Sequence, residues 1–367
     1  MNRFCKAIMF FLPTKNIVSL LLDKYYFLEM RMKAKWLICL SIVLLCLFAI
    51  LGCSNKKKDV VAEGNAVYYW RTTFRMNDYE RNFLKEHNVT KMYLKFFDIV
   101  ENWDGKIMPV GTTIFIDSIP KDVTIVPTVF ITSEAVAKYP EFIDKMYKRV
   151  EDMASANGVK YSEIQIDCDW TESTSEQYFA FMKQLRTILE PKGIELSATV
   201  RMFQLDYEAP EADYGVLMCY NTGNLKDWET DNSILDIKDV KPYMSKLSGY
   251  KLPLSVALPC FSWDVTFGGE KNLLGIEYNS YDFSDKRFSK ISENKYEIDK
   301  DKERDTYYDY WTPCYVRHEE VSLKDILEVK DMVVSKMSDK PLQMVLYQLD
   351  SVNLSKFSSD EVEKIYR

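Results

Sequence analysis

The chain has 367 residues, of which 47% are hydrophobic and 28% charged, a globular composition that excludes collagen-like, low-complexity and wholly disordered proteins. Its net charge of −7 and pI near 5.2 argue against nucleic acid as a partner, because phosphate binding requires a basic face. Only two histidines occur, His87 and His318, and we expect neither a metal nor a cofactor.

The first predicted element is a leader over residues 1–52. Within it, Met32 opens a short basic start that is followed by the apolar segment Trp36–Leu51, the pattern of a secretory signal. This segment is short for a membrane-spanning helix. We therefore expect translation to begin at Met32 and the signal to be removed. An uncleaved N-terminal membrane anchor is the alternative.

The leader ends in Ile50-Leu51-Gly52-Cys53, which resembles the bacterial lipobox. The resemblance implies that Cys53 is lipidated and becomes the first residue of the mature chain. Residues 53–65 then form a solvated tether. The predicted location is the bacterial cell envelope, with the protein anchored by lipid to the outer membrane on its periplasmic or surface face.

From residue 66 onward, short β-rich segments alternate with helical ones. The predicted strands are Ala66–Trp70, Lys91–Asp98, Thr124–Phe130, Glu163–Asp169, Glu195–Phe203, Tyr214–Tyr220, Leu252–Pro259 and Leu342–Leu349. The predicted helices are Asn77–His87, Pro140–Asn157, Ser173–Glu190, Ile237–Leu247 and Ser322–Met337. Ser173 and Glu176 have the spacing of a capping box at the start of the third helix.

This alternation predicts parallel strands joined by crossover helices, and eight strands fit a (β/α)8 TIM barrel over residues 66–367. A doubly wound open sheet is the second choice, although no glycine-rich phosphate loop follows any predicted strand. The segment Asp264–Glu320 interrupts the alternation between strands seven and eight. A connection of that length is usually functional or forms a subdomain, so we treat 264–320 as an insertion.

The segment Ile164–Glu172 gives the strongest functional signal. Because side chains alternate along a strand, Asp167 and Asp169 lie on one face and the apolar residues between them on the other. The acidic face then points into the barrel, toward the C-terminal mouth where barrel enzymes act. Two such carboxylates have split pKa values suited to acid–base chemistry. A structural pair neutralised by Arg201 is the alternative.

Four segments resemble the family-eighteen glycoside hydrolases, the chitinase-like barrels, in that family's order over most of residues 66–360. They are Ile164–Glu172, similar to its DxxDxDxE signature; Leu217–Asn221, similar to its sixth-strand Met-x-Tyr-Asp; Val256–Phe261, similar to its seventh-strand Gly-x-Pro-x-Tyr; and Val345–Asp350, where its last strand carries a Trp. Many chitinases have a small α+β subdomain at the position of the insertion. Within this resemblance, the chain is more similar to exported bacterial lipoproteins whose barrels have a degenerate catalytic motif.

The resemblance implies catalytic roles for Asp167, Asp169, Glu172 and Tyr220. In the family, the final Glu of the signature protonates the glycosidic oxygen, while the preceding Asp and the sixth-strand Tyr hold the acetamido group that acts as nucleophile. Asp169 and Tyr220 match these positions, but Thr171 stands where the acid belongs. Glu172 comes one residue later and has the opposite strand parity. A hydroxyl cannot act as this general acid at neutral pH.

Aromatic residues make up 14% of the chain, and rings around a cleft suit sugar ligands, although rings spread through a large core are the alternative. We expect five residues to line such a cleft: Trp70, Arg201, Asn221, Trp263 and Tyr347.

The sequence leaves three alternative functions open. The first is a glycan-binding lipoprotein without the catalytic Glu. The second is a divergent glycosidase that uses Glu172, from a strand-end bulge, or Asp169. The third is a structural envelope lipoprotein with a filled barrel.

Overall fold

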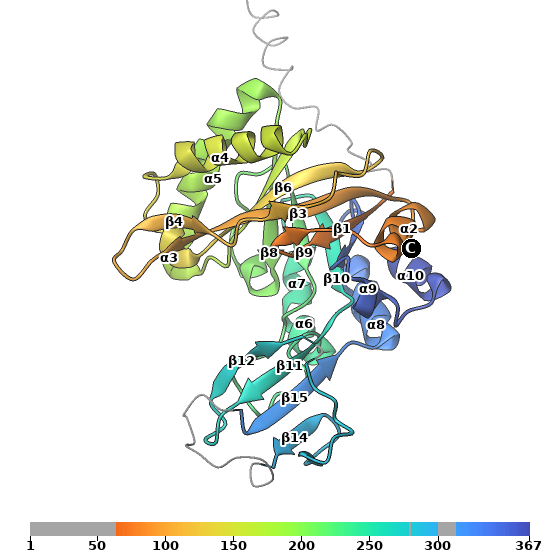
Figure 1. Ribbon diagram of the computed structural model, residues 1–367. Helices are drawn as coiled ribbons and strands as arrows, with labels where there is room; N and C mark the ends of the chain where they lie inside the picture. Colours follow the sequence, from red (N-terminus) through yellow and green to blue (C-terminus); the bar gives the residue numbers. More distant parts are fainter. Residues whose placement is uncertain (1–63, 279, 300–312) are drawn as a thin grey trace, which may run out of the picture. The chain divides into compact units, whose positions relative to one another are not determined.

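The computed structural model describes residues 64–278, 280–299 and 313–367, so the predicted leader, Cys53 and nearly all of the tether lie outside it. Eight parallel strands form a closed barrel (Figure 1): β1 (Asn65–Tyr69), β3 (Val89–Glu101), β6 (Thr124–Ile131), β7 (Glu163–Asp167), β8 (Glu195–Arg201), β9 (Tyr214–Met218), β10 (Leu254–Pro259) and β16 (Met344–Tyr347). The barrel closes because β1 pairs with both β16 and β3. Each strand coincides with a predicted one, and the (β/α)8 prediction is confirmed.

Four of the five predicted helices form: α2 (Asp78–Glu86), α4 (Ile143–Ala156), α5 (Ser175–Leu189) and α8 (Leu323–Lys336). The fifth prediction, Ile237–Leu247, is wrong as a continuous helix. It is divided into α6 (Ile237–Val240), a 3₁₀ turn (Lys241–Tyr243) and α7 (Met244–Leu247). Pro242 lies in the turn, and its missing N–H cannot complete a helical hydrogen bond. Short helices α3 (Ser133–Val136), α9 (Ser351–Leu354) and α10 (Ser359–Tyr366) were not predicted.

The connection between β3 and β6 departs from the alternating pattern. Residues 102–123, all of which are described, contain β4 (Ile107–Val110) and β5 (Ile114–Phe115) but no helix. β4 runs antiparallel to the end of β3, and β5 pairs with β2 (Thr73–Phe74) in the loop that follows β1. The segment between them is held at the end of β3, since Thr113 Oγ1 donates to the Lys95 carbonyl at 2.6 Å.

The insertion is an antiparallel sheet with strand order β12-β11-β15-β14-β13. Its strands are β11 (Ser262–Phe267), β12 (Leu273–Glu277), β13 (Phe288–Lys290), β14 (Lys295–Ile298) and β15 (Tyr315–Glu320). It therefore begins two residues before the predicted 264–320 boundary. Its described residues contain no helix, unlike the α+β subdomain that the resemblance implies. None of the described helices of the chain is long and apolar enough to cross a membrane.

Polar side chains along β7 line the inside of the barrel. Tyr68 of β1 donates a hydrogen bond across the barrel to Gln165 Oε1 at 2.9 Å, which places Gln165 in the interior. Glu163 and Asp167 share its parity and so face inward, whereas Ile164 and Ile166 face the helices. Ser197 and Lys91 bind the buried Glu163 carboxylate at 2.6 and 2.9 Å. The strand thus carries a polar row from the base of the barrel to its mouth.

Candidate functional site

Asp167 is the last residue of β7 and lies at the mouth of the barrel. Its side chain is buried, and Oδ1 accepts a 2.6 Å hydrogen bond from Thr199 of β8. Burial raises the pKa of Asp167 to about 6, an effect that the nearby charge of Asp169 adds to and that Arg201 and the Thr199 bond oppose. Asp167 is therefore an inward carboxyl that takes up a proton just below neutral pH.

Asp169 lies two residues beyond the end of β7, because the strand is shorter than predicted. Arg201, the last residue of β8, binds both of its oxygens, with Nε 2.5 Å from Oδ1 and Nη2 3.2 Å from Oδ2. Burial lowers the pKa of Arg201, but the carboxylates of Asp169 and Asp167 outweigh burial and hold it above its ordinary value. The arginine is thus a fixed cation between two acids. The Asp169 side chain remains 44% exposed.

After Asp169 the chain leaves the strand, so that Glu172 opens a 3₁₀ turn (Glu172–Thr174) and Thr171 is the N-cap of this turn. Thr171 Oγ1 is 3.0 Å from Ser173 Oγ, and the Thr171 amide donates to Thr174 Oγ1 at 3.1 Å. The predicted Ser173–Glu176 capping box is therefore wrong, since the observed capping pair is Thr171 and Thr174. The Glu172 side chain is exposed, and no described residue bonds to its carboxylate. The structure does not bring Glu172 to Asp167 or Asp169.

Five rings form an aromatic cluster at the mouth: Tyr68, Trp70, Tyr220, Phe261 and Tyr347. Tyr220 and Tyr347 stack with centroids 4.6 Å apart, and Trp70 lies 6.3 Å from Tyr347. Phe261 meets both tyrosines edge-on. Trp70 and Tyr347 are half-buried, so they present the accessible ring surface of the cluster.

The hydroxyl of Tyr220 is buried and has no hydrogen-bond partner among the described residues. Burial raises the pKa of Tyr220 well above its usual value, so the hydroxyl keeps its proton and is a donor. The resemblance implies that Tyr220 and Asp169 act together, but in the described chain no hydrogen bond joins Tyr220 to Asp167 or Asp169. A buried polar atom without a partner calls for a water or a ligand.

Two of the predicted ligand-binding residues lie apart from this arrangement. Trp263 is in β11, only 6% exposed, and its indole N–H donates to Glu319 Oε2 at 2.7 Å. Its ring meets that of Phe261 in the cluster edge-on, with centroids 5.2 Å apart. Asn221 follows Tyr220 with an exposed side chain and a positive φ of 54°. Trp263 therefore stabilises the insertion. The Asn221 side chain makes no described hydrogen bond to the residues at the mouth.

Asp98, near the end of the barrel portion of β3, was not predicted as a site residue, and Lys95, a strand-end residue that could line a cleft, lies beside it. Their side chains pair at 2.7 Å, and Lys95 Nζ lies 5.8 Å from the Trp70 ring. Burial raises the pKa of Asp98, and its Oδ1 has no partner in the described chain. A Cβ at Gly111 would approach Asp98 Oδ2 to 2.4 Å, so this pair needs glycine there. Asp98 could have been found from the sequence, because it is a carboxylate at the end of the predicted strand Lys91–Asp98.

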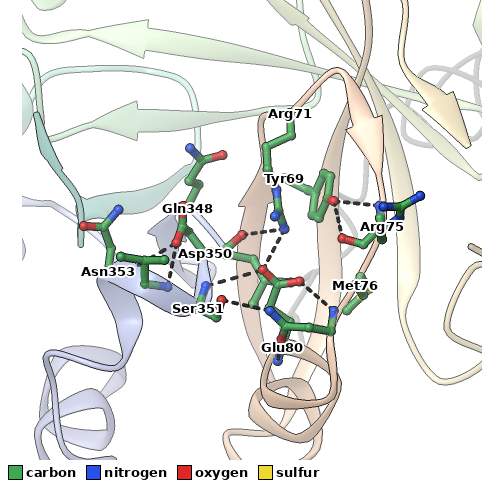
Figure 2. Close-up of polar contacts among 12 residues, drawn as sticks. Tyr69, Arg71, Arg75, Met76, Glu80, Gln348, Asp350, Ser351 and Asn353 are labelled. Carbon is green, nitrogen blue, oxygen red and sulfur yellow. Dashed lines mark hydrogen bonds and ion pairs between the residues drawn. The ribbon is translucent and has the colours of Figure 1, made fainter. Parts of the chain in front are cut away.

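The loop from β1 to α2 is fixed to the segment after β16, as Figure 2 shows. Arg71 Nη2 donates to the buried Glu80 at 2.8 Å and to the Leu349 carbonyl at 3.3 Å. Gln348 Oε1 accepts from the Trp70 amide at 3.0 Å. These bonds join the first and last strands of the barrel and hold the backbone of Trp70 beside Tyr347.

No protein-family model matches the chain, and no curated protein matches it. Among solved structures, it is similar to the C-terminal domain of a protein assigned as a chitinase from Desulfitobacterium hafniense DCB-2 (11% identity, 83% of this chain and 100% of that one, TM-score 0.51). The class V chitinase of Nicotiana tobaccum (9% identity, 82% and 97%, TM-score 0.49) and the chitinase of Chromobacterium violaceum ATCC 12472 (12%, 82% and 98%, 0.49) are also similar. At these identities the likeness concerns the fold alone, a chitinase-like (β/α)8 barrel.

Proposed function

We propose that the chain is a carbohydrate-binding barrel that does not hydrolyse its ligand. The observation that carries the proposal is the local structure after β7. Thr171 takes the position of the acid and bonds to Ser173, and Glu172 is exposed without a described partner. Asp169 is held by Arg201 through both oxygens, and Asp167 is buried against Thr199. The described chain therefore has a hydroxyl, and no carboxylic acid, at the position of the family's general acid.

The aromatic cluster supports a saccharide as the ligand. Half-buried rings of Trp70 and Tyr347 offer apolar faces for a sugar ring, and Asp169 and Tyr220 offer an acceptor and a donor beside them. This combination lies at the C-terminal ends of the strands, where barrels bind ligands, and its position supports the proposal. The ring surface would supply binding affinity, and the polar groups would fix the orientation of the sugar.

The test is an assay of wild type, Thr171→Glu and Glu172→Gln on aryl glycosides of N-acetylglucosamine and on glycan mixtures. We expect no turnover by wild type and no change in Glu172→Gln. A general acid contributes roughly 10²–10⁴-fold in rate, so Thr171→Glu should gain measurable turnover if the remaining site is intact. Robust wild-type turnover that disappears in Glu172→Gln would overturn the proposal.

One observation favours the divergent glycosidase as the second candidate. Asp167 has a pKa of about 6, near the working range of a general acid, and it lies beside the partly exposed Asp169. In that case Asp167→Asn and Asp169→Asn would each abolish turnover, while Glu172→Gln retained it. Failure of every saccharide to bind, with no turnover, would instead favour the third candidate, a structural envelope lipoprotein.

We further propose that Cys53 carries lipid and anchors the barrel in the bacterial cell envelope. The support is the sequence Ile50-Leu51-Gly52-Cys53 after a basic and apolar leader. Two or three acyl chains anchor a protein stably, whereas one does not. Mass spectrometry of the mature protein should find an acylated N-terminal Cys53. Cys53→Ser should leave the leader unprocessed, and an intact 32–52 segment in wild type would refute the proposal.

A further inference from the structure

A cavity of about 700 Å³ adjoins the aromatic cluster and is lined by residues from Trp70 to Asn77 in the loop between β1 and α2. We call it the arginine pocket. Trp70 belongs to both the pocket and the aromatic cluster, so the two are continuous. The pocket is lined by two arginines, Arg71 and Arg75, and by no acidic side chain. Its lining is therefore cationic, in contrast to the three aspartates at the barrel mouth.

The two arginines differ in how far the protein already satisfies them. Arg71 is engaged by Glu80 and the Leu349 carbonyl, although its buried Nε has no partner among the described residues. Arg75 is exposed, and no described residue bonds to its guanidinium or pairs with it. A second acid beside this loop, Asp117, pairs with Arg81 at 2.8 Å and accepts from the Met76 amide at 2.9 Å. Arg75 thus retains its full capacity for an anion.

The backbone of Arg75 is nevertheless fixed, as Figure 2 shows. The Arg75 amide donates to the hydroxyl of Tyr69 at 2.9 Å, and this hydroxyl lies 2.9 Å from the Arg75 carbonyl. Thr72 and Thr73, on the same loop, are exposed and make no described side-chain hydrogen bond. A cation on a rigid loop next to two hydroxyls is suited to a planar anion.

We propose that the arginine pocket binds the carboxylate of an acidic saccharide whose neighbouring sugar rests on the aromatic cluster. The inference rests on the proposed function and deepens it by naming the ligand class. Arg75 forms the ion pair, the exposed Thr72 and Thr73 beside it offer hydroxyls, and Trp70 supports the neighbouring sugar. The cations at the mouth, Arg201 and Lys95, are already paired with Asp169 and Asp98, whereas Arg75 has no described ion-pair partner. The acidic unit is therefore directed to the pocket, and the mouth takes a neutral unit.

The test compares matched saccharides by calorimetry on the mature chain. One arm uses a uronic acid oligosaccharide and its carboxyl-reduced counterpart. The other uses a disaccharide of N-acetylglucosamine and N-acetylmuramic acid, whose carboxylate is on a lactyl ether, and its amide. The variants are Arg75→Gln and, as control, Lys183→Gln, which removes one charge from an exposed position of α5.

In at least one arm we expect wild type and Lys183→Gln to bind the acidic form about tenfold more tightly than the neutral form, a difference of about 1.4 kcal/mol. Arg75→Gln should lose this preference and bind the neutral form as wild type does. Equal affinity for both forms in both arms, or a preference that survives in Arg75→Gln, would overturn the inference. Binding of neutral saccharides without any preference would leave the proposed function standing, whereas no binding in either arm would remove both.

Discussion

Two arginine–carboxylate pairs, one at the barrel mouth and one in the insertion, have the same contact distance and different surroundings. Arg201 is 2.5 Å from Asp169, and Arg317 is 2.5 Å from Glu319. The insertion pair is fully buried, whereas the Asp169 side chain is 44% exposed. The comparison shows that an ion pair does not by itself mark a functional site. The distinction depends on whether the polar groups around the pair already have hydrogen-bond partners.

In the insertion every group around the pair is satisfied. Glu319 Oε2 accepts from the Ser233 amide, the Ser233 hydroxyl and the Trp263 indole, and Arg317 also donates to the carbonyls of Asp227 and Leu225. At the mouth, Tyr220 Oη and Asp98 Oδ1 have no partner in the described chain. The first arrangement fixes the insertion to the loop after β9. The second leaves polar capacity for a ligand.

The largest effect should come from breaking the buried pair. Arg317→Met leaves the Glu319 charge uncompensated and should lower the free energy of unfolding by about 3–5 kcal/mol. Arg201→Met leaves a partly solvated Asp169 and should lower it by no more than about 1–2 kcal/mol. Urea unfolding followed by circular dichroism measures both. Equal losses in the two variants would contradict the distinction between the regions.

A smaller effect should appear in the pH dependence of stability. The folded-state pKa of Asp167 is raised to about 6, so between about pH 4 and 6 the folded chain binds more protons than the unfolded chain. Stability from this group is therefore greatest below about pH 4 and decreases as pH rises from 4 to 6, by about 3 kcal/mol in total. Asp167→Asn should remove this slope. Unfolding curves at a series of pH values check it, and an unchanged slope would refute it.

The smallest effects should separate the two tryptophans. Trp263→Phe removes one hydrogen bond to a buried carboxylate and should lower stability by about 1–2 kcal/mol while saccharide affinity is unchanged. Trp70→Ala removes half-buried ring surface at the mouth and should abolish saccharide binding with a smaller loss of stability. Thermal unfolding and titration calorimetry on both variants make the comparison. Weakened saccharide binding by Trp263→Phe would mean that the insertion forms part of the binding site, contrary to this prediction.

The barrel was predictable because its signals are local. Apolar strands alternated with helical periodicity, and period-two parity separated Asp167 from Ile166 on opposite faces of β7. The pairing of Arg201 with Asp169 was foreseen as an alternative for the same reason, since both lie at strand ends. Four motifs in family order then pointed to the chitinase-like fold.

What escaped prediction depends on long-range contacts. The hydrogen bond from Trp263 to Glu319 joins residues 56 positions apart in the sequence, and the one from Trp70 to Gln348 joins residues 278 positions apart. No local pattern reveals either. The absence of a helix between β3 and β6 also depends on how the segment 102–123 packs against the loop after β1. The early end of β7 placed Glu172 on a turn, where strand parity no longer applied.

The central claim, that the mouth binds a saccharide without cleaving it, is tested most directly by measuring binding and product in one sample. Wild type and Tyr347→Ala are titrated with neutral and acidic oligosaccharides while tryptophan fluorescence reports binding, and released reducing ends are then quantified. The account predicts saturable binding by wild type, its loss in Tyr347→Ala, and no product from either. Product released by wild type and abolished in Asp169→Asn or Glu172→Gln would contradict it.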